Sequence, residues 1–172
     1  MVIKVLGAIL IICGTGGWGV LGVLRLRRRC RILSELTGMI GAVRSEITTR
    51  LTPVPELISR LAGESPEPVS LFLKHVEERL VDIGVLTLYS IWEEALINTP
   101  ELSLLQDELD ALKEVPRALG RYDLEEQRLS LSRTERQFEQ FLQRAENIRE
   151  RDSKIKGFIG LAAGVFIVLI LI

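Results

Sequence analysis

Apolar residues follow two kinds of pattern along the chain: long uncharged runs near the two ends, and a helical periodicity between them. Residues 5–24 and 157–172 contain no charged side chain. The first run has the length of a helix that crosses a hydrocarbon core of about 30 Å, whereas the second rises only about 24 Å and is short for this task. We therefore expect transmembrane helices at residues 1–24 and 157–172, with a separate domain at residues 25–156.

The central segment is predicted to be a series of amphipathic helices. Apolar positions recur in steps of three and four from residue 33 to residue 51, and Thr52 followed by Pro53 suits the N-cap and first position of the next helix. Glycines and prolines divide the chain further, with Pro116 interrupting the fifth helix before a turn at Leu119-Gly120. The expected helices cover residues 33–51, 53–63, 69–83, 86–99 and 102–115.

The last central helix carries a seam typical of a coiled coil. Leu124, Leu131, Phe138 and Ala145 recur every seven residues, and each is followed three residues later by Gln127, Thr134, Phe141 or Ile148. A helix with such a seam packs lengthwise against another helix. The sequence thus predicts an all-α fold: an antiparallel helical bundle of about six helices between an N-terminal and a C-terminal transmembrane helix.

Basic residues flank both uncharged runs on the side of the central domain. They are Arg25, Arg27, Arg28, Arg29, Arg31, Arg149, Arg151, Lys154 and Lys156. By the positive-inside rule, the central domain is cytoplasmic and both termini lie outside. The first run also resembles a cleaved signal peptide, but its length and its lack of a small-x-small cleavage site favour an uncleaved anchor.

Small residues lie one helical turn apart in the first run, where Cys13 pairs with Gly17 and Thr15 with Gly19. This spacing favours close packing against another membrane helix, and the alternative is the ordinary tolerance of membrane helices for glycine. A glycine loop that binds phosphate is disfavoured, since it needs a preceding strand and an acidic residue in the next unit.

Charge is distributed unevenly in the central domain. Residues 32–148 contain 12 Lys plus Arg and 21 Asp plus Glu, a net charge of −9. An acidic surface attracts a basic cytoplasmic partner over a long range, although solvated helix faces would give the same composition. The candidate interface residues are Glu77, Glu78, Glu93, Glu94, Asp107 and Glu108. Nucleic acid is disfavoured as a partner, because the clustered arginines lie at lipid headgroup depth without interleaved aromatics.

The residue inventory does not favour catalysis or a cofactor. His75 is the single histidine, which excludes metal sites built on two histidines. Cys13 and Cys30 would lie about 25 Å apart along one helix, which is too far for a disulfide. Adjacent glutamates point about 100° apart on a helix and do not form an acid/base pair. We expect no enzyme activity, no metal and no cofactor.

Two segments carry a family resemblance. Residues 119–127 match a Leu-Gly-x-x-Asp-x-x-x-Gln run, and residues 92–95 match Trp-Glu-Glu-Ala. With these motifs in this order, the chain resembles the stage III sporulation protein AB family of endospore-forming bacteria. That family's cytoplasmic domain is similar to the F-type platform proteins of type II secretion and type IV pilus systems. A looser match to the platform proteins begins at Thr52-Pro53 and departs from their pattern at Pro55 and Leu57.

The first motif also has a physical interpretation. Leu119 and Gly120 end one helix, with Gly120 expected in the left-handed conformation, and Asp123 caps the next helix with Gln127 one turn beyond. A structural cap explains these residues without any further role.

The resemblance implies a membrane platform in the mother-cell membrane that faces the forespore. Its implied partners are a secretion-type ATPase encoded in the same operon and the other subunits of the channel between the two cells. Further copies of the chain, in a homo-oligomer, are another candidate partner. Two alternatives stay open: a membrane-anchored helical adaptor that recruits a cytoplasmic partner, and an undetected membrane enzyme.

Overall fold

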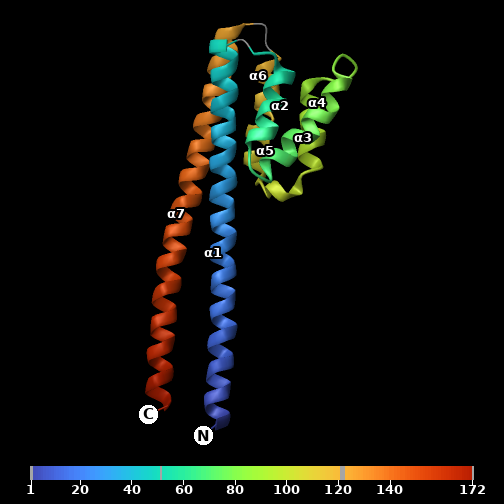
Figure 1. Cartoon of the computed structure of the whole chain (residues 1–172). Coiled ribbons are helices and arrows are strands. Elements are labelled where there is room, and N and C mark those ends of the chain that lie inside the picture. Colours follow the sequence, from blue (N-terminus) through green and yellow to red (C-terminus); the bar gives the residue numbers. More distant parts are fainter. Residues whose placement is uncertain (1, 51, 121–122, 172) are drawn as a thin grey trace. The chain divides into compact units, whose positions relative to one another are not determined.

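The structure is a computed structural model. It describes the backbone of residues 2–50, 52–120 and 123–171, and the side chains of residues 22, 24–47, 49, 52–120 and 123–152. Its elements are α1 (Val2–Ser45), the π-helix η1 (Glu46–Arg50), α2 (Val54–Glu64), α3 (Val69–Arg79), the 3-10 helix η2 (Leu80–Asp82), α4 (Leu88–Ile97), the 3-10 helix η3 (Pro100–Leu102), α5 (Gln106–Leu112), α6 (Glu114–Leu119) and α7 (Leu124–Leu171). The described residues form no strand beyond an isolated bridge between Ile83 and Leu86. The predicted all-α class is confirmed (Figure 1).

The chain divides into two compact units. The terminal unit contains Met1–Cys30 and Gln143–Ile172, and the central unit contains Arg31–Leu142. The long helices α1 and α7 contribute to both units, so that the predicted domain at residues 25–156 overlaps both.

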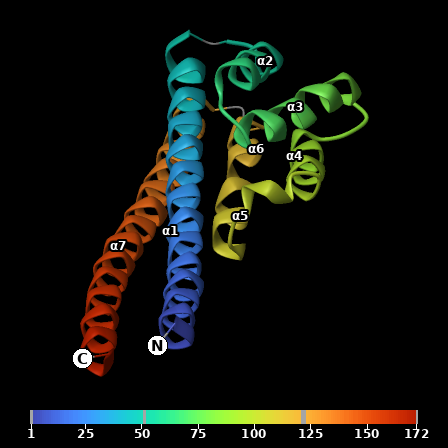
Figure 2. The same ribbon diagram turned by 60° about the horizontal axis from the view of Figure 1, so that its bottom comes forward.

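In the terminal unit, α1 and α7 run side by side in opposite directions (Figures 1 and 2). Cys30 is buried there, and burial raises the pKa of its thiol, against the opposing effect of the Arg149 charge. Among the described residues, no helix is both long and apolar enough to cross a membrane. Apart from Gly22 and Leu24, the two predicted spans lie outside the residues whose side chains are described.

In the central unit, α1 and α7 approach each other closely. A Cβ atom at Gly41 would lie 2.7 Å from Glu135 Oε1, and Arg44 Nε lies 2.8 Å from Glu135 Oε2. Leu36, Met39, Ile40 and Val43 of α1 are buried. On α7, the seam positions Leu131 and Phe138 are fully buried, as the heptad predicts, whereas Leu124 at the start of the helix is 48 % exposed.

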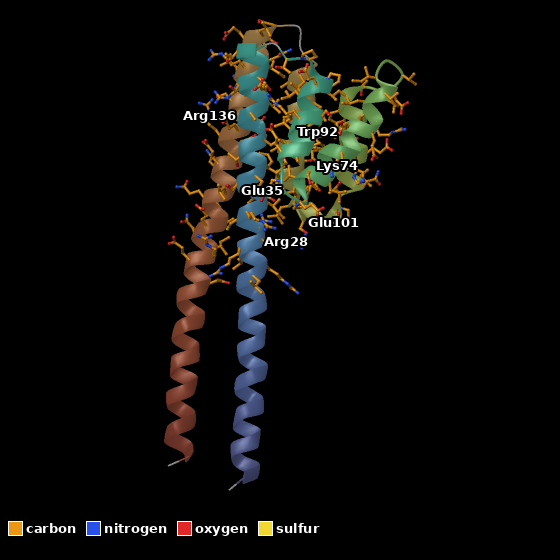
Figure 3. All side chains as sticks on the ribbon, in the orientation of Figure 1. Arg28, Glu35, Lys74, Trp92, Glu101 and Arg136 are labelled. Atoms are coloured by element: carbon orange, nitrogen blue, oxygen red, sulfur yellow. The ribbon has the colours of Figure 1, made fainter. Side chains whose placement is uncertain are left out.

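Helices α2 to α6, residues 54–119, form a group that we call the short-helix cluster. In this cluster α3 packs against α2 and α4, and α6 packs against α4 and α5. The ring of Phe72 meets the ring of Trp92 edge-on, with 4.9 Å between the centroids and 84° between the planes. Trp92 is fully buried in the cluster (Figure 3). A continuous apolar core therefore holds helices that are individually too short to be stable.

Two predicted helix boundaries are wrong. Thr52 does not cap α2: Pro53 takes the N-cap position, and the Thr52 hydroxyl donates to Glu46 Oε2 over 2.9 Å. The prediction of one helix at residues 102–115 is also wrong. Ser103 adopts a left-handed φ of 48°, and α5 starts after it, at Gln106. This helix ends at Leu112, and α6 begins at Glu114. Pro116 lies in the first turn of α6, where proline removes no helical hydrogen bond, so it helps to start a helix instead of interrupting one.

The expected left-handed conformation of Gly120 is also wrong. Gly120 has a φ of −81°, and its N–H donates to Pro116 O over 3.2 Å, so right-handed geometry continues to the end of α6. The described glycine with a positive φ is Gly84, at 107°, in the turn between α3 and α4.

Candidate functional site

Two of the predicted interface glutamates, Glu78 and Glu94, belong to α3 and α4, which pack against each other. Arg79 at the end of α3 has one guanidinium nitrogen 2.7 Å from Asp82 Oδ2 and the other 3.4 Å from Glu94 Oε2. Glu78 precedes Arg79 and lies one turn before Asp82. We call Glu78, Asp82 and Glu94 the acidic cluster. Asp82 and Glu94 contact the Arg79 guanidinium. Together with Glu78, three carboxylates stand against this one cation, so the group carries a net negative charge.

Glu93 has a different environment from its neighbour Glu94. Lys113 Nζ lies 2.6 Å from Glu93 Oε1, and this hydrogen bond raises the pKa of Lys113. Lys113 lies between α5 and α6, so the pair ties α4 to that junction. Glu93 therefore acts first as a contact between helices, while Glu77 is half-buried and Glu78 is exposed.

Asp107 and Glu108 stabilise the start of α5. Glu108 is 1 % exposed, and its Oε2 accepts a hydrogen bond from the Leu105 N–H over 2.8 Å. Asp107 is exposed, and its Oδ1 accepts from the Glu108 N–H over 3.1 Å. The prediction that Glu108 faces a partner is wrong, because a glutamate at the third position of a helix reaches back to the free N–H groups at the helix start.

Asp123 takes the geometry expected of a cap. Its Oδ1 accepts from the Glu125 N–H over 2.9 Å, and its backbone carbonyl accepts from the Gln127 N–H over 2.9 Å. Leu119 is the last residue of α6, and Gly120 follows it. The described residues of the family motif thus form the end of one helix and the start of the next.

The predicted topology residues are only partly described. Arg25, Arg27, Arg28 and Arg151 are exposed, and Arg29 and Arg149 are half-buried. Arg31 belongs to the central unit, where its Nε lies 3.5 Å from Glu35 Oε1. Six of the predicted site residues lie outside the residues whose side chains are described: Lys154, Lys156, Cys13, Thr15, Gly17 and Gly19.

His75 has a structural partner. Its Nδ1 lies 3.0 Å from the Thr99 hydroxyl, which itself donates to Ala95 O over 2.9 Å. Because the hydroxyl proton is already used, His75 donates to Thr99. Within the described part of the chain, no three acidic, histidine or cysteine side chains gather in a geometry suited to a metal ion.

A polar groove of about 490 Å³ lies between α6 and α7. Its lining residues are Glu114, Ser130, Arg133, Thr134, Arg136, Gln137 and Gln140. Glu114 already pairs with Arg117. The groove offers hydrogen-bonding groups and positive charge, and its lining includes no apolar residue.

An exposed apolar turn lies between α3 and α4 and was not predicted from the sequence. Residues Val81, Ile83 and Val85, which we call the apolar turn, are 85 %, 48 % and 90 % exposed. The turn lies at the outer edge of the short-helix cluster in both views (Figures 1 and 2). The periodicity assigned this stretch to the end of a helix, and the alternation of apolar residues with Asp82 and Gly84 was the signal that it is a turn.

Comparisons with known proteins agree with each other. The family model described as stage III sporulation protein AB matches residues 4–172. The stage III sporulation protein AB of Bacillus subtilis (strain 168) is 25 % identical over 170 residues, which cover 98 % of this chain and 99 % of the relative. A solved structure of a stage III sporulation protein AB superposes with a TM-score of 0.66 at 22 % identity, covering 72 % of this chain and 98 % of the other. At that identity, the structural likeness shows the fold alone.

Proposed function

Because the chain belongs to the stage III sporulation protein AB family, whose model it matches over residues 4–172, we propose that it is a non-enzymatic membrane platform in sporulation. In this role it sits in the mother-cell membrane and connects a cytoplasmic secretion-type ATPase to subunits of the channel facing the forespore. The runs at residues 1–24 and 157–172 cross the membrane, both termini lie outside, and the central unit is cytoplasmic.

The charge of the short-helix cluster carries the proposal. Residues 54–119 contain 13 Asp plus Glu and 5 Lys plus Arg, a net charge of −8. Such a surface attracts a basic protein partner and is repelled by anionic lipid, so it suits a domain that faces the cytoplasm and docks a soluble protein. The acidic cluster contributes carboxylates to this surface from α3, from α4 and from the segment between them.

A direct binding measurement tests the proposal. The full-length chain in lipid nanodiscs is titrated with the purified ATPase of the same operon at 0.1 M and 1 M NaCl. We expect the Kd to rise at least tenfold at high salt, because the Debye length falls to about 3 Å. No binding at low salt overturns the platform role with this ATPase, and an unchanged Kd at 1 M NaCl overturns the electrostatic mechanism.

Charge reversal locates the surface. Glu78→Lys with Glu94→Lys should weaken binding at least tenfold. The matched control is Glu64→Lys with Glu139→Lys, which changes the net charge equally at two other exposed glutamates and should have a smaller effect. Equal effects of the two pairs would mean that net charge, and not the acidic cluster, governs binding.

A purification from sporulating cells separates the platform from the adaptor. The tagged full-length chain is cross-linked in cells and recovered in mild detergent, and the bound proteins are identified by mass spectrometry. Recovery of the ATPase and channel subunits is expected for a platform. Recovery of unrelated signalling proteins without the ATPase would favour the adaptor instead.

A further inference from the structure

The apolar turn exposes more hydrophobic surface than its position requires. Val81 is 85 % exposed and Val85 is 90 % exposed, while Phe72 and Val76, earlier on α3, are fully buried. A solvated β-branched side chain gains nothing from the hydrophobic effect, and clustered apolar side chains at an exposed tip are typical of a contact site. Other exposed apolar residues, such as Ile97 and Leu129, lie singly on their helices.

Backbone hydrogen bonds fix the shape of the turn. The Ile83 N–H donates to Leu80 O over 3.1 Å, and the Val85 and Leu86 N–H groups both donate to Asp82 O, over 3.1 and 3.0 Å. Gly84 supplies the positive φ of 107° that closes the turn. The backbone that carries the two valines is therefore held in one shape before any partner binds, which lowers the entropy cost of association.

The charges beside the turn define the chemistry of its partner. Asp82 lies within the turn, and Glu78 and Glu94 flank it, with Arg79 as the balancing cation. A complementary surface has an apolar cleft with Lys or Arg at its rim. An anionic lipid surface would be repelled by these carboxylates, and the groove between α6 and α7 of a second copy has no apolar lining.

We propose that the apolar turn is the anchor of the docking surface: Val81 and Val85 enter an apolar cleft on a soluble cytoplasmic protein, and basic residues at the rim of the cleft meet the acidic cluster. This inference rests on the proposed function and specifies how the ATPase is held. It follows the usual organisation of protein interfaces, in which a few central apolar contacts supply affinity and a charged rim supplies orientation and association rate.

The test uses Val81→Ser with Val85→Ser in the full-length chain in nanodiscs, titrated with the purified ATPase. The matched control, Ile97→Ser with Leu129→Ser, removes exposed apolar groups elsewhere. Circular dichroism and the thermal midpoint establish that both variants fold. We expect the turn variant to bind at least tenfold more weakly, and the control to bind within twofold of the wild type.

The outcomes separate this inference from the proposed function. If the wild type binds the ATPase and the turn variant binds equally well, the anchor is overturned while the platform role stands. If the wild type does not bind, the platform role with this ATPase fails, and the assigned occupant of the turn fails with it. If the turn variant and the control weaken binding equally, the turn has no special part and the inference is again overturned.

Two further measurements test other occupants. A change in the oligomeric mass of the turn variant alone, measured by light scattering, would assign the turn to a second copy of the chain. A fluorophore on Val85→Cys, in a background that also carries Cys13→Ser and Cys30→Ala, is placed in nanodiscs of phosphatidylcholine and phosphatidylglycerol. Quenching of this fluorophore by brominated lipid would assign the turn to the membrane. Either result overturns the proposal, and we expect neither.

Discussion

The long helices of the central unit and the short-helix cluster carry different charges and are held together differently. Residues 31–45 of α1 and 124–142 of α7 contain five acidic and five basic side chains, whereas residues 54–119 have a net charge of −8. The long pair is held by a lengthwise apolar seam and the close approach at Gly41. The cluster is held by a compact core around Phe72 and Trp92 and by ion pairs between helices, including Glu93–Lys113.

The two regions are therefore suited to different roles. A neutral pair with a regular seam is suited to support and to transmit movement along its length, because its contacts repeat. Short helices packed on one core leave their outer faces free to vary, so that charge and an exposed turn accumulate there. If the two regions are energetically separate, substitutions in each should affect the unfolding of the full-length chain in detergent differently.

Removing the central aromatic residue should disrupt the cluster while the long pair persists. Trp92→Ala is expected to cost about 3–5 kcal/mol, because Trp92 is fully buried and the cavity collapses only in part. Limited proteolysis should then cut within residues 54–119 before it cuts α1 or α7. Trp92→Phe is the milder control, and simultaneous loss of both regions would contradict their energetic separation.

The stability lost on substitution along the seam of α7 should depend on how deeply each side chain is buried. Leu131→Ala is expected to destabilise the central unit by about 2–4 kcal/mol, since Leu131 is fully buried. Leu124→Ala removes the same atoms from a residue that is 48 % exposed and should cost less than about 1 kcal/mol. Chemical denaturation measures both, and equal costs would mean that the seam extends to the start of α7.

Replacement by alanine should cost stability at one glycine and almost none at another. Gly84→Ala forces a side chain into a positive φ of 107° and should destabilise the cluster by about 1 kcal/mol or more. Gly120 has a φ of −81°, and a Cβ atom added there would lie 3.6 Å and 3.8 Å from backbone oxygens, which is ordinary contact. Gly120→Ala should therefore change the free energy of unfolding by less than about 0.5 kcal/mol. A large loss at Gly120 would restore the left-handed interpretation.

A small pH effect is expected on the long pair. Burial raises the pKa of Glu35 on α1, against the opposing charge of Arg31. A raised pKa means that the stability conferred by the protonated carboxyl is full below the unfolded pKa and is lost as the pH rises through the folded pKa. Glu35→Gln should therefore raise the free energy of unfolding at pH 7 by less than about 1 kcal/mol, and should give no such gain near pH 4. Glu139→Gln, on an exposed face, should show no such difference between the two pH values.

Local pattern was sufficient for much of the fold. The period of apolar positions located the helices, and the heptad identified Leu131 and Phe138 as buried positions on α7. Asp123 was identified as a cap from its place before an apolar periodic run. These inferences succeed because backbone hydrogen bonding and side-chain spacing within a helix depend on nearby residues alone.

The environment of the candidate interface residues was harder to predict, because it depends on which helix ends meet. Glu108 satisfies its own helix start and is buried, Glu93 is held by Lys113, and Glu94 shares Arg79 with Asp82. Adjacent glutamates in the sequence thus have different environments that composition does not distinguish. Packing between helices decides which charged groups lie next to each glutamate, and the period of apolar positions does not encode this packing.

The sequence by itself determined the helical class, the positions of most helices, the family and the excess of acidic residues at 54–119 over the neutral long pair. Tertiary structure decided the handedness at Gly84 and Gly120, the division of α5 from α6, and the exposure of Val81 and Val85. The physical reason is the range of the interactions involved. Helix formation and net charge follow from neighbours along the chain, whereas exposure and backbone handedness at a turn depend on where the flanking helices pack.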